Sequence, residues 1–266
     1  KACLARPNAS AIKLDNGQRI VAESTTDIEA GLAMGMELNS KSTTVNSLEV
    51  KAITSNNYTI SNTLTKLKVN MNMMGQPNNY DSDNKEGNNE EMAKIFDERL
   101  NRPVDIIIDN TTGTSVTETK KVKKQDADES NPADDLMKMF SDNSDDAIVS
   151  GAFEIIPRGK SIGDSWSDTT AAKNMKVIRK YILNAVSGNE ATIQVDIVSN
   201  AVNKLNFQEM EFEIKTETKT KGEIITDIST GLVKKRTANS DITGTIPMMG
   251  QEMPISAKST SSTVYK

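Results

Sequence analysis

Apolar and polar residues alternate along most of this chain, which is the period-two pattern of half-buried β-strands. The clearest runs lie at residues 32–38, 48–52, 58–64, 193–197 and 253–263. One face of each run is apolar and the other is polar, so each predicts an antiparallel strand with one side on a core and the other in water. We therefore expect a mainly β protein.

The apolar positions change parity inside the strand that begins near residue 58. They are even-numbered up to Leu64 and odd-numbered from Leu67 onward. A regular strand would turn its core face over between them, so the sequence predicts a β-bulge at residues 65–66 and a curved sheet. A second parity change, between Phe207 and Met210, predicts that the bend recurs in the second half.

The middle of the chain changes to a helical period. Residues 89–101 predict a first helix, with Met92 and Phe96 on one apolar stripe. Asn131 and Pro132 predict the cap and first turn of a second helix. A third helix is expected from residue 144 to 156. Residues 104–122 predict a hairpin that turns at 110–113. The sequence therefore predicts short helices around a hairpin in the middle of the chain.

Two features suggest an approximate duplication. The tetrapeptide Met-Met-Gly-Gln occurs at residues 73–76 and again at 248–251, and residues 183–193 repeat the strand, turn and strand of residues 51–60. The predicted organisation is an N-terminal tail (1–11), a first β repeat (12–84), a helical and hairpin insert (85–158) and a second β repeat (159–266). The expected fold is mainly β (α+β), either two related curved antiparallel sheets or one open half-barrel, with two or three short helices inserted between the repeats.

Length and charge narrow the classes of function. A chain of 266 residues can bury a sizeable core. Its net charge of -5, with acidic residues concentrated between 81 and 146, would repel a polyanion, so we expect no nucleic-acid partner. No apolar run approaches the ~20 residues that cross a bilayer, so we expect no transmembrane segment.

The residue inventory argues against most catalytic chemistry. The chain has no histidine and one cysteine, Cys3, which excludes Ser/His/Asp triads, Cys/His pairs and thiolate metal clusters. Residues 81–84 open like a calcium loop, but Lys85 and Glu86 break the ligand pattern. We expect no enzymatic activity, no metal and no cofactor. An enzyme that uses only carboxylates is the least favoured alternative.

Methionine is the most unusual component, with 13 residues in the chain. Its flexible thioether fills cores, but it can also line a surface that accepts variable apolar ligands. Copper(I) binding is a further alternative. The sole tryptophan is either a core anchor or a ligand platform. The candidate ligand-binding residues are Met34, Met36, Met71, Met73, Met74, Trp166, Met248, Met249 and Met253.

The order of several short motifs resembles an uncharacterised family of exported bacterial proteins, often predicted lipoproteins, that carry a domain of unknown function. The motifs are Gly17-Gln18, the tip at residues 71–76 with the acidic segment 80–83, the segment 163–166, the turn 229–232 and the hairpin 248–253. The resemblance spans roughly residues 12 to 266. It implies an exported protein of the periplasm, outer membrane or cell surface, with a distant likeness to open-barrel lipoprotein-carrier folds.

Together these features predict a non-enzymatic bacterial cell-envelope protein that binds an apolar ligand in a β concavity. The ligand would be a lipid, another apolar small molecule, or a lipidated or apolar peptide. The alternative is a structural or protein–protein interaction module that docks an envelope partner and has no ligand cavity. A continuous apolar concavity would separate the two readings.

Overall fold

A computed structural model describes residues 11–31, 35, 37–116, 145–172, 174–207, 210–248 and 251–266. The first half contains β1 (Arg19–Gly31), β2 (Glu37–Ile53), β3 (Asn57–Met73), β4 (Gln76–Asp81), α1 (Glu90–Asp97) and β5 (Pro103–Asp109). The second half contains α3 (Asp145–Gly151), β6 (Ser165–Ala172), β7 (Met175–Ser187), β8 (Glu190–Phe207), β9 (Met210–Asp227), β10 (Val233–Met248) and β11 (Gln251–Tyr265).

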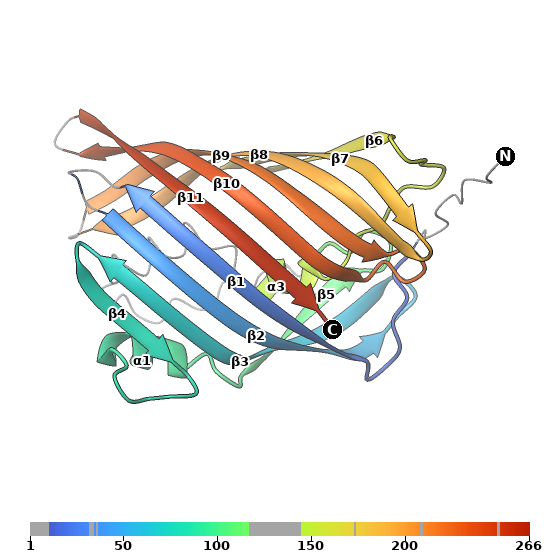
Figure 1. The fold of residues 1–266 in the computed structure, drawn as a ribbon, viewed down its shortest axis with the longest axis horizontal. Helices are drawn as coiled ribbons and strands as arrows, with labels where there is room; N and C mark the ends of the chain where they lie inside the picture. The colour runs from blue at the N-terminus through green and yellow to red at the C-terminus, as the bar shows by residue number, and fades with distance from the viewer. Residues whose placement is uncertain are drawn as a thin grey trace.

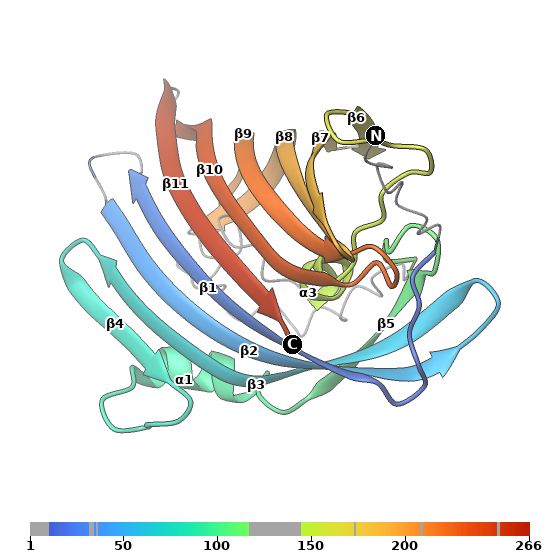
Figure 2. The same ribbon diagram turned by 45° about the vertical axis from the view of Figure 1, so that its right-hand side comes forward.

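All eleven described strands belong to one antiparallel sheet. Its order is β4-β3-β2-β1-β11-β10-β9-β8-β7-β6, and β5 pairs with β3 beside this path. The sheet is not closed, because β4 and β6 stand at opposite ends of that order. It curves into a trough with α3 on the concave side (Figures 1 and 2). The open half-barrel is therefore the correct one of the two predicted arrangements.

The predicted bulge in β3 is confirmed. Val45 pairs with Lys66 and Asn46 pairs with Leu64, which leaves Thr65 as the extra residue. The Thr65 hydroxyl donates to the Val45 carbonyl at 3.0 Å, so the bulged residue gains a partner. Two glycines allow further close approach of the strands. A Cβ on Gly222 would lie 2.5 Å from the Thr237 carbonyl oxygen, and one on Gly244 would lie 2.4 Å from that of Lys215.

Two strand predictions are wrong. Gly31 pairs antiparallel with Glu37, so the chain reverses within residues 32–38, where one continuous strand was expected. Apolar and polar residues alternate across this reversal, as they would in a single strand. The register of β8 with β9 is regular up to the Phe207–Met210 pair. The second parity change therefore marks a hairpin turn, and no second bend is needed there.

The helices begin as predicted but are shorter. Asn89 caps α1, because its side-chain oxygen accepts from the backbone N–H groups of Glu91 and Met92. The third predicted helix is α3, and it ends at Gly151 because the next residues pair as extended chain. Glu154 N–H donates to the Gly231 carbonyl at 2.9 Å. The helix expected near Asn131, and most of the partner strand expected at residues 114–122, lie outside the described residues.

The two sequence repeats follow different shifts. The β2–β3 hairpin has a register shift between Val50 and Ala52, and the β7–β8 hairpin has one between Leu183 and Ala185, which is a shift of 133 residues. The Met-Met-Gly-Gln tips lie 175 residues apart, in the β3–β4 and β10–β11 hairpins. These tips are therefore not equivalent positions of one repeat, and the division of the chain into two repeats stays a prediction.

Candidate functional site

The concave face of the sheet is the candidate functional site. Directly paired residues of neighbouring strands share a face, so the register identifies the inward positions. One row contains Ile224, Arg236, Thr263 and Ser24, each paired with the next. The same rule extends to every described strand.

The inward positions change from polar to apolar along adjacent strands, towards the β3–β4 and β10–β11 tips. The inward residues of β10 are Arg236, Ala238, Ser240, Ile242, Gly244 and Ile246. Those of β11 are Thr263, Ser261, Ser259, Ala257, Ile255 and Met253. Those of β1 and β2 are Ser24, Thr26, Ile28, Ala30, Thr44, Ser42, Ser40 and Leu38. The polarity gradient therefore runs along four neighbouring strands.

We give the name hydroxyl belt to twelve inward Ser and Thr residues of β1, β2, β8, β9, β10 and β11. Its members are Ser24, Thr26, Ser40, Ser42, Thr44, Ser199, Thr218, Thr220, Ser240, Ser259, Ser261 and Thr263. Those on β1 and β2 are buried. Two contacts join strands through the belt: Ser24 to Thr263 at 2.9 Å and Thr220 to Ser240 at 2.7 Å, measured between hydroxyl oxygens. Apolar side chains would fill a core at these positions equally well. The belt is therefore a polar feature of the inner face.

Apolar clusters lie on both sides of the belt. The cluster towards the tips comprises Ile28, Ala30, Leu38, Leu67, Val69, Met71, Tyr80, Met92, Ile214, Ile242, Ile246, Ile255 and Ala257. We call it the tip cluster. The other cluster contains α3 residues, such as Val149, and lies where α3 occupies the concavity. Both clusters consist of buried residues, so the inner face is packed at the α3 end and at the tip end.

A charged cluster joins the belt to the α3 end. On the described inward strand positions the charged side chains are Asp168, Arg179 and Arg236, and Glu154 reaches them from the segment after α3. Arg236 Nη2 lies 3.1 Å from Glu154 Oε2, and Arg179 Nη1 lies 2.9 Å from Asp168 Oδ1. The Tyr181 hydroxyl donates to Asp168 Oδ2 at 3.1 Å.

Burial dominates the electrostatics of this cluster. It raises the pKa of the Glu154 carboxyl, although the Arg236 guanidinium opposes the shift. Burial also raises the pKa of the Tyr181 hydroxyl. Arg236 Nε is buried and has no hydrogen-bond partner among the described residues. The cluster therefore holds a positive group that Glu154 does not fully satisfy.

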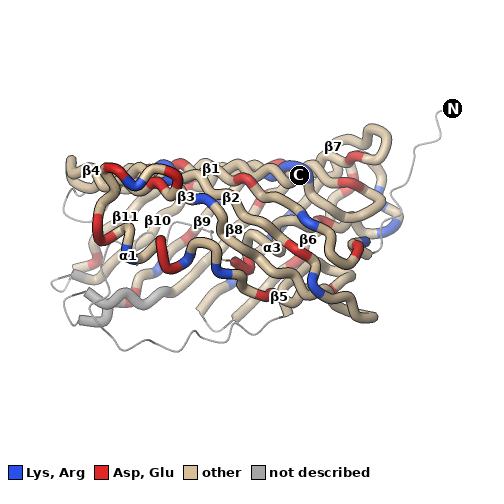
Figure 3. Tube along the Cα trace, turned by 90° about the horizontal axis from the view of Figure 1, so that it is seen from below, with Lys and Arg blue, Asp and Glu red and all other residues tan. Residues whose placement is uncertain are grey.

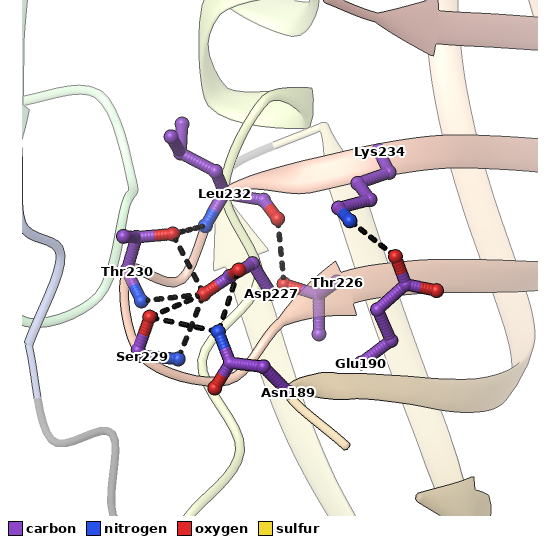
Figure 4. A network of polar contacts seen from close by, with 8 residues as sticks. All are labelled: Asn189, Glu190, Thr226, Asp227, Ser229, Thr230, Leu232 and Lys234. Carbon is purple, nitrogen blue, oxygen red and sulfur yellow. Dashed lines mark hydrogen bonds and ion pairs between the residues drawn. The ribbon is translucent and has the colours of Figure 1, made fainter. Parts of the chain in front are cut away.

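The α3 end is held by two related turns. The Asp227 Oδ1 atom accepts from the backbone N–H and hydroxyl groups of both Ser229 and Thr230, at 2.6–3.1 Å. Asn189 donates to the other carboxylate oxygen at 2.7 Å (Figure 4). Asp109 makes the same four contacts with Thr111 and Thr112.

The segment at residues 12–14 connects these two turns. Ile12 N–H donates to Asn110 O at 2.8 Å, and Lys13 N–H donates to Thr230 O at 3.0 Å. The Ile12 carbonyl accepts from the Tyr58 hydroxyl at 2.9 Å, and the Ile12 side chain is buried. The segment therefore ties the two flanks of the trough together at the α3 end.

The structure places the predicted methionines at the opposite end. Met71 is buried in the tip cluster, Met73 packs against it, and Met253 is half-buried on the same face. Met74 occupies the hairpin turn at φ 55° and is 64% exposed. Met34, Met36 and Met249 lie outside the described residues, as does the side chain of Met248.

Trp166 lies apart from the methionines. Its ring stacks on Tyr181 with centroids 5.3 Å apart, and it packs against the α3-end cluster. The structure therefore brings Met71 and Met73 together but separates Trp166 from them. Binding of a ligand by any of these residues stays a prediction.

Two hollows of about 790 and 350 Å³ lie elsewhere on the sheet. The larger is lined by Lys176, Asn200, Lys215, Glu217 and Thr243, which alternate with the inward positions. The neighbouring inward isoleucines of β9 and β10 do not line it, so it is a trough on the outer face. The smaller hollow is lined by outward residues such as Asp27, Asn39 and Asn72, and the inward Ile28, Ser40 and Met71 also line it. Neither hollow is an enclosed apolar cavity.

On the described part of the outer surface, charges of both signs are mixed. Lysines and arginines are interspersed with acidic residues along the strands (Figure 3). In the loop that opens like a calcium site, Asp81 pairs with Lys68 at 2.9 Å and Asp83 with Lys66 at 2.8 Å. Among the described residues no group of three metal-ligating side chains gathers, and no helix is long and apolar enough to cross a bilayer.

The hydroxyl belt and the charged cluster were missed by sequence reasoning that followed apolar residues only. Alternating hydroxyls at residues 40, 42 and 44 and at 259, 261 and 263 were a usable signal, because they continue the parity of apolar neighbours. The Glu154–Arg236 pair joins residues 82 positions apart, and no local pattern announces it.

Comparisons with known proteins give a family but no activity. The model of a family of unknown function (DUF6263) matches residues 55–233. A comparison with curated proteins found no match.

Three solved structures show distant likenesses. A lipovitellin structure, described for its lipid–protein interactions, has TM-score 0.48 and 11% identity. The match covers 96% of this chain and 25% of that one, so the chain spans about a quarter of it. Pseudomonas aeruginosa OccK5 has TM-score 0.25 and 6% identity, with 95% and 99% covered. A Pseudomonas putida outer membrane channel has TM-score 0.23 and 8% identity, with 96% and 97% covered. Likenesses this distant carry no functional information.

Proposed function

The chain belongs to DUF6263, a family of unknown function, and we propose that it binds an apolar ligand on the concave face of the sheet. The ligand class is a lipid or a lipidated or apolar peptide. The role needs no catalysis, and it suits a protein exported to the bacterial cell envelope, as the motif resemblance implies.

The tip cluster is the observation that carries this proposal. Its strand residues come from β1, β2, β3, β4, β9, β10 and β11, so one apolar cluster extends across the trough. Of the described helices, α1 contacts β4, and α3 contacts β3 and β5. The isoleucines of β10 and β11 in this cluster are at most 8% exposed, so a ligand bound there would lie in the apolar interior of the trough. The open edges β4 and β6 leave a route by which a ligand can reach this face.

Methionine suits this surface chemically. Met71 and Met73 lie in or against a cluster that also contains branched side chains of fixed shape, such as Ile255. An unbranched thioether can change rotamer to follow a different ligand, whereas an isoleucine cannot. The methionine-rich end of the trough would therefore accept acyl chains of more than one shape.

Native mass spectrometry of protein purified from its own host tests this function. We expect an adduct of lipid mass that is lost when the protein is denatured, and uptake of a fluorescent fatty acid by delipidated protein. A clean apo mass combined with no uptake would refute the proposal. Fractionation of host cells tests the envelope location, because a protein confined to the cytoplasm would refute export.

The second candidate function is a protein-interaction module, and the edge strand β6 favours it. All but one of its residues are exposed, and it contains no proline to block pairing. The other edge strand, β4, contains Pro77 and is contacted by α1. A partner strand could therefore add to β6. A proline at Thr169, on this edge, would abolish capture of such a partner, but it would leave uptake of fatty acid by the inner face unchanged.

A further inference from the structure

The open edge of the sheet at β6 fits a second copy of this chain. We infer that β6 pairs antiparallel with β6 of another copy, around a two-fold axis at Thr169. This inference names a partner for the edge strand of the second candidate function. It does not depend on ligand binding by the inner face.

The backbone groups of β6 point alternately towards β7 and towards the open edge. The Leu183 N–H of β7 donates to the Asp164 carbonyl at 3.0 Å, and the Leu183 carbonyl accepts from the Gly163 N–H at 2.8 Å. Odd-numbered residues of β7 therefore bond towards β6, and their partners in β6 are even-numbered. The β6 residues that direct both backbone groups to the edge are the odd-numbered ones, Ser165, Ser167, Thr169 and Ala171.

The chain blocks the corresponding edge at the other end of the sheet. The odd-numbered residues of β4 face that edge, because the even-numbered ones bond to β3. Pro77 has no N–H to offer a partner strand, and the Asn79 carbonyl accepts from the Asn89 N–H at 2.8 Å. The Asn88 side chain bonds the N–H and the carbonyl of Asp81 at 2.8 and 3.1 Å. These contacts close β4 to continuous pairing, which is a usual protection of a sheet edge.

The edge of β6 is blocked at one position among the described residues. Lys160 Nζ donates to the Ser165 carbonyl at 2.7 Å. Ser167, Thr169 and Ala171 are exposed, and no contact between described residues uses their edge-facing backbone groups. The register of β6 with β7 has no shift, so the strand is regular here. A regular row of unpaired groups is a template for one more strand.

The residues of β6 favour one register for pairing with themselves. Hydrogen-bonded pairs must join odd-numbered residues, because these have the free edge groups. An axis at Asp168 would place two carboxylates directly opposite each other, which is destabilising. An axis at Thr169 pairs Thr169 with its own copy, and Ser167 with Ala171 of the other copy. All three open residues are then used, and the pairs exchange about six backbone hydrogen bonds.

Side chains on both faces of the sheet agree with this register. Thr169 lies in one outward row with Ile178 and Val198, and the axis joins this row to its own copy. Ile178 is half-buried and Val198 is 37% exposed, so the seam continues an apolar row from one sheet to the other. Threonines that face each other across strands are a favourable pair. On the inward face, Trp166 lies opposite the small Ala172 of the other copy.

The expected dimer is weak and closed. Stable interfaces bury about 1,200–2,000 Å², and a seam of one short strand is smaller. Association should therefore lie in the micromolar range. Growth stops at two copies, because β6 pairs with itself and the edge of β4 is blocked.

Sedimentation velocity of the full chain tests the inference, at concentrations up to about 200 µM. We expect a reversible monomer–dimer equilibrium for wild type. Thr169→Glu and Thr169→Lys each place two like charges at the axis and should weaken the dimer at least about tenfold. An equimolar mixture of the two variants places opposite charges there and should restore dimerisation. This rescue requires that position 169 faces its own copy.

Thr43→Glu and Thr43→Lys are the matched controls, because Thr43 is exposed on the outer face of β2, and both should leave the dimer unchanged. A wild type that stays monomeric would overturn the inference, even if β6 takes up a strand of another protein. Dimers that Thr169→Glu leaves intact would overturn the seam, and variants that stay monomeric when mixed would overturn the register.

Fatty-acid uptake by the same samples separates this inference from the proposed function. Dimers without uptake would refute ligand binding and support the inference. Uptake by a wild type that stays monomeric would do the reverse.

Discussion

Asp227 is the residue whose removal best tests how the α3 end is held. Its Oδ1 atom accepts four hydrogen bonds within the turn, and its Oδ2 atom accepts one from Asn189. A hydrogen bond to a charged group contributes about 1.5–3 kcal/mol, and losing a cap of this kind costs about 0.5–2 kcal/mol. The turn is partly open to water, so we expect Asp227→Ala to reduce the free energy of unfolding by about 2–3 kcal/mol in total.

The assay is urea unfolding at pH 7, with the loss read from the midpoint at unchanged slope. Asp105→Ala is the matched control, because Asp105 is exposed on β5, and it should change stability by less than about 0.5 kcal/mol. Asp109→Ala removes the related turn and should resemble Asp227→Ala. If Asp227→Ala behaves like Asp105→Ala, the turns do not hold the end of the trough.

The same variant has a defined pH dependence. Burial opposes ionisation of Asp227, but the hydrogen bonds from Ser229 and Thr230 outweigh it and lower the pKa of this carboxyl. A lowered folded-state pKa gives stability that is present above the unfolded value of about 3.9 and is lost as the pH falls through the folded value. The difference between wild type and Asp227→Ala should therefore be constant near neutrality and shrink below about pH 4. A difference that grows on acidification would contradict this.

Three further predictions concern other parts of the fold. Gly222→Ala should destabilise the protein by about 1–3 kcal/mol in thermal unfolding, because the new Cβ would meet a backbone carbonyl. Gly31→Ala is the control and should cost less, because its Cβ would lie 3.5 Å from the Ser256 hydroxyl. Burial raises the pKa of Glu154, so the free energy of unfolding of wild type should fall relative to that of Glu154→Gln as the pH rises above about 4.3. Parallel pH profiles of the two unfolding free energies would refute this. Tyr265→Phe should cost about 1 kcal/mol in urea unfolding through loss of the hydrogen bond to the Ile148 carbonyl, and no loss would show that this bond does not stabilise the fold.

The hairpins that the sequence predicted well have alternating apolar residues on both sides of a recognisable turn. The β2–β3 and β10–β11 hairpins and the bulge at Thr65 all follow from the parity of Ile, Leu, Val and Met positions. The β1–β2 hairpin was misread because five of its paired inward positions are Ser or Thr, while four apolar residues alternate across its turn.

Less of the candidate site could be predicted. The sequence named the methionines as candidate residues, and Met71 and Met73 lie in or against the tip cluster. The charged cluster depends on the register of four strands and on Glu154, which is positioned by its backbone bond to Gly231. Such long-range contacts arise only in the folded sheet, so the alternation of residues within one strand does not predict them.

The location of a bound chain on the concave face can be measured directly. A fatty acid carrying a nitroxide near its methyl end should broaden the methyl NMR signals of Ile242, Ile246 and Ile255, which face the trough. The signals of Ile178 and Ile182, on the outward positions of β7, should stay sharp. Broadening of the outward pair with sharp inward signals would contradict the account.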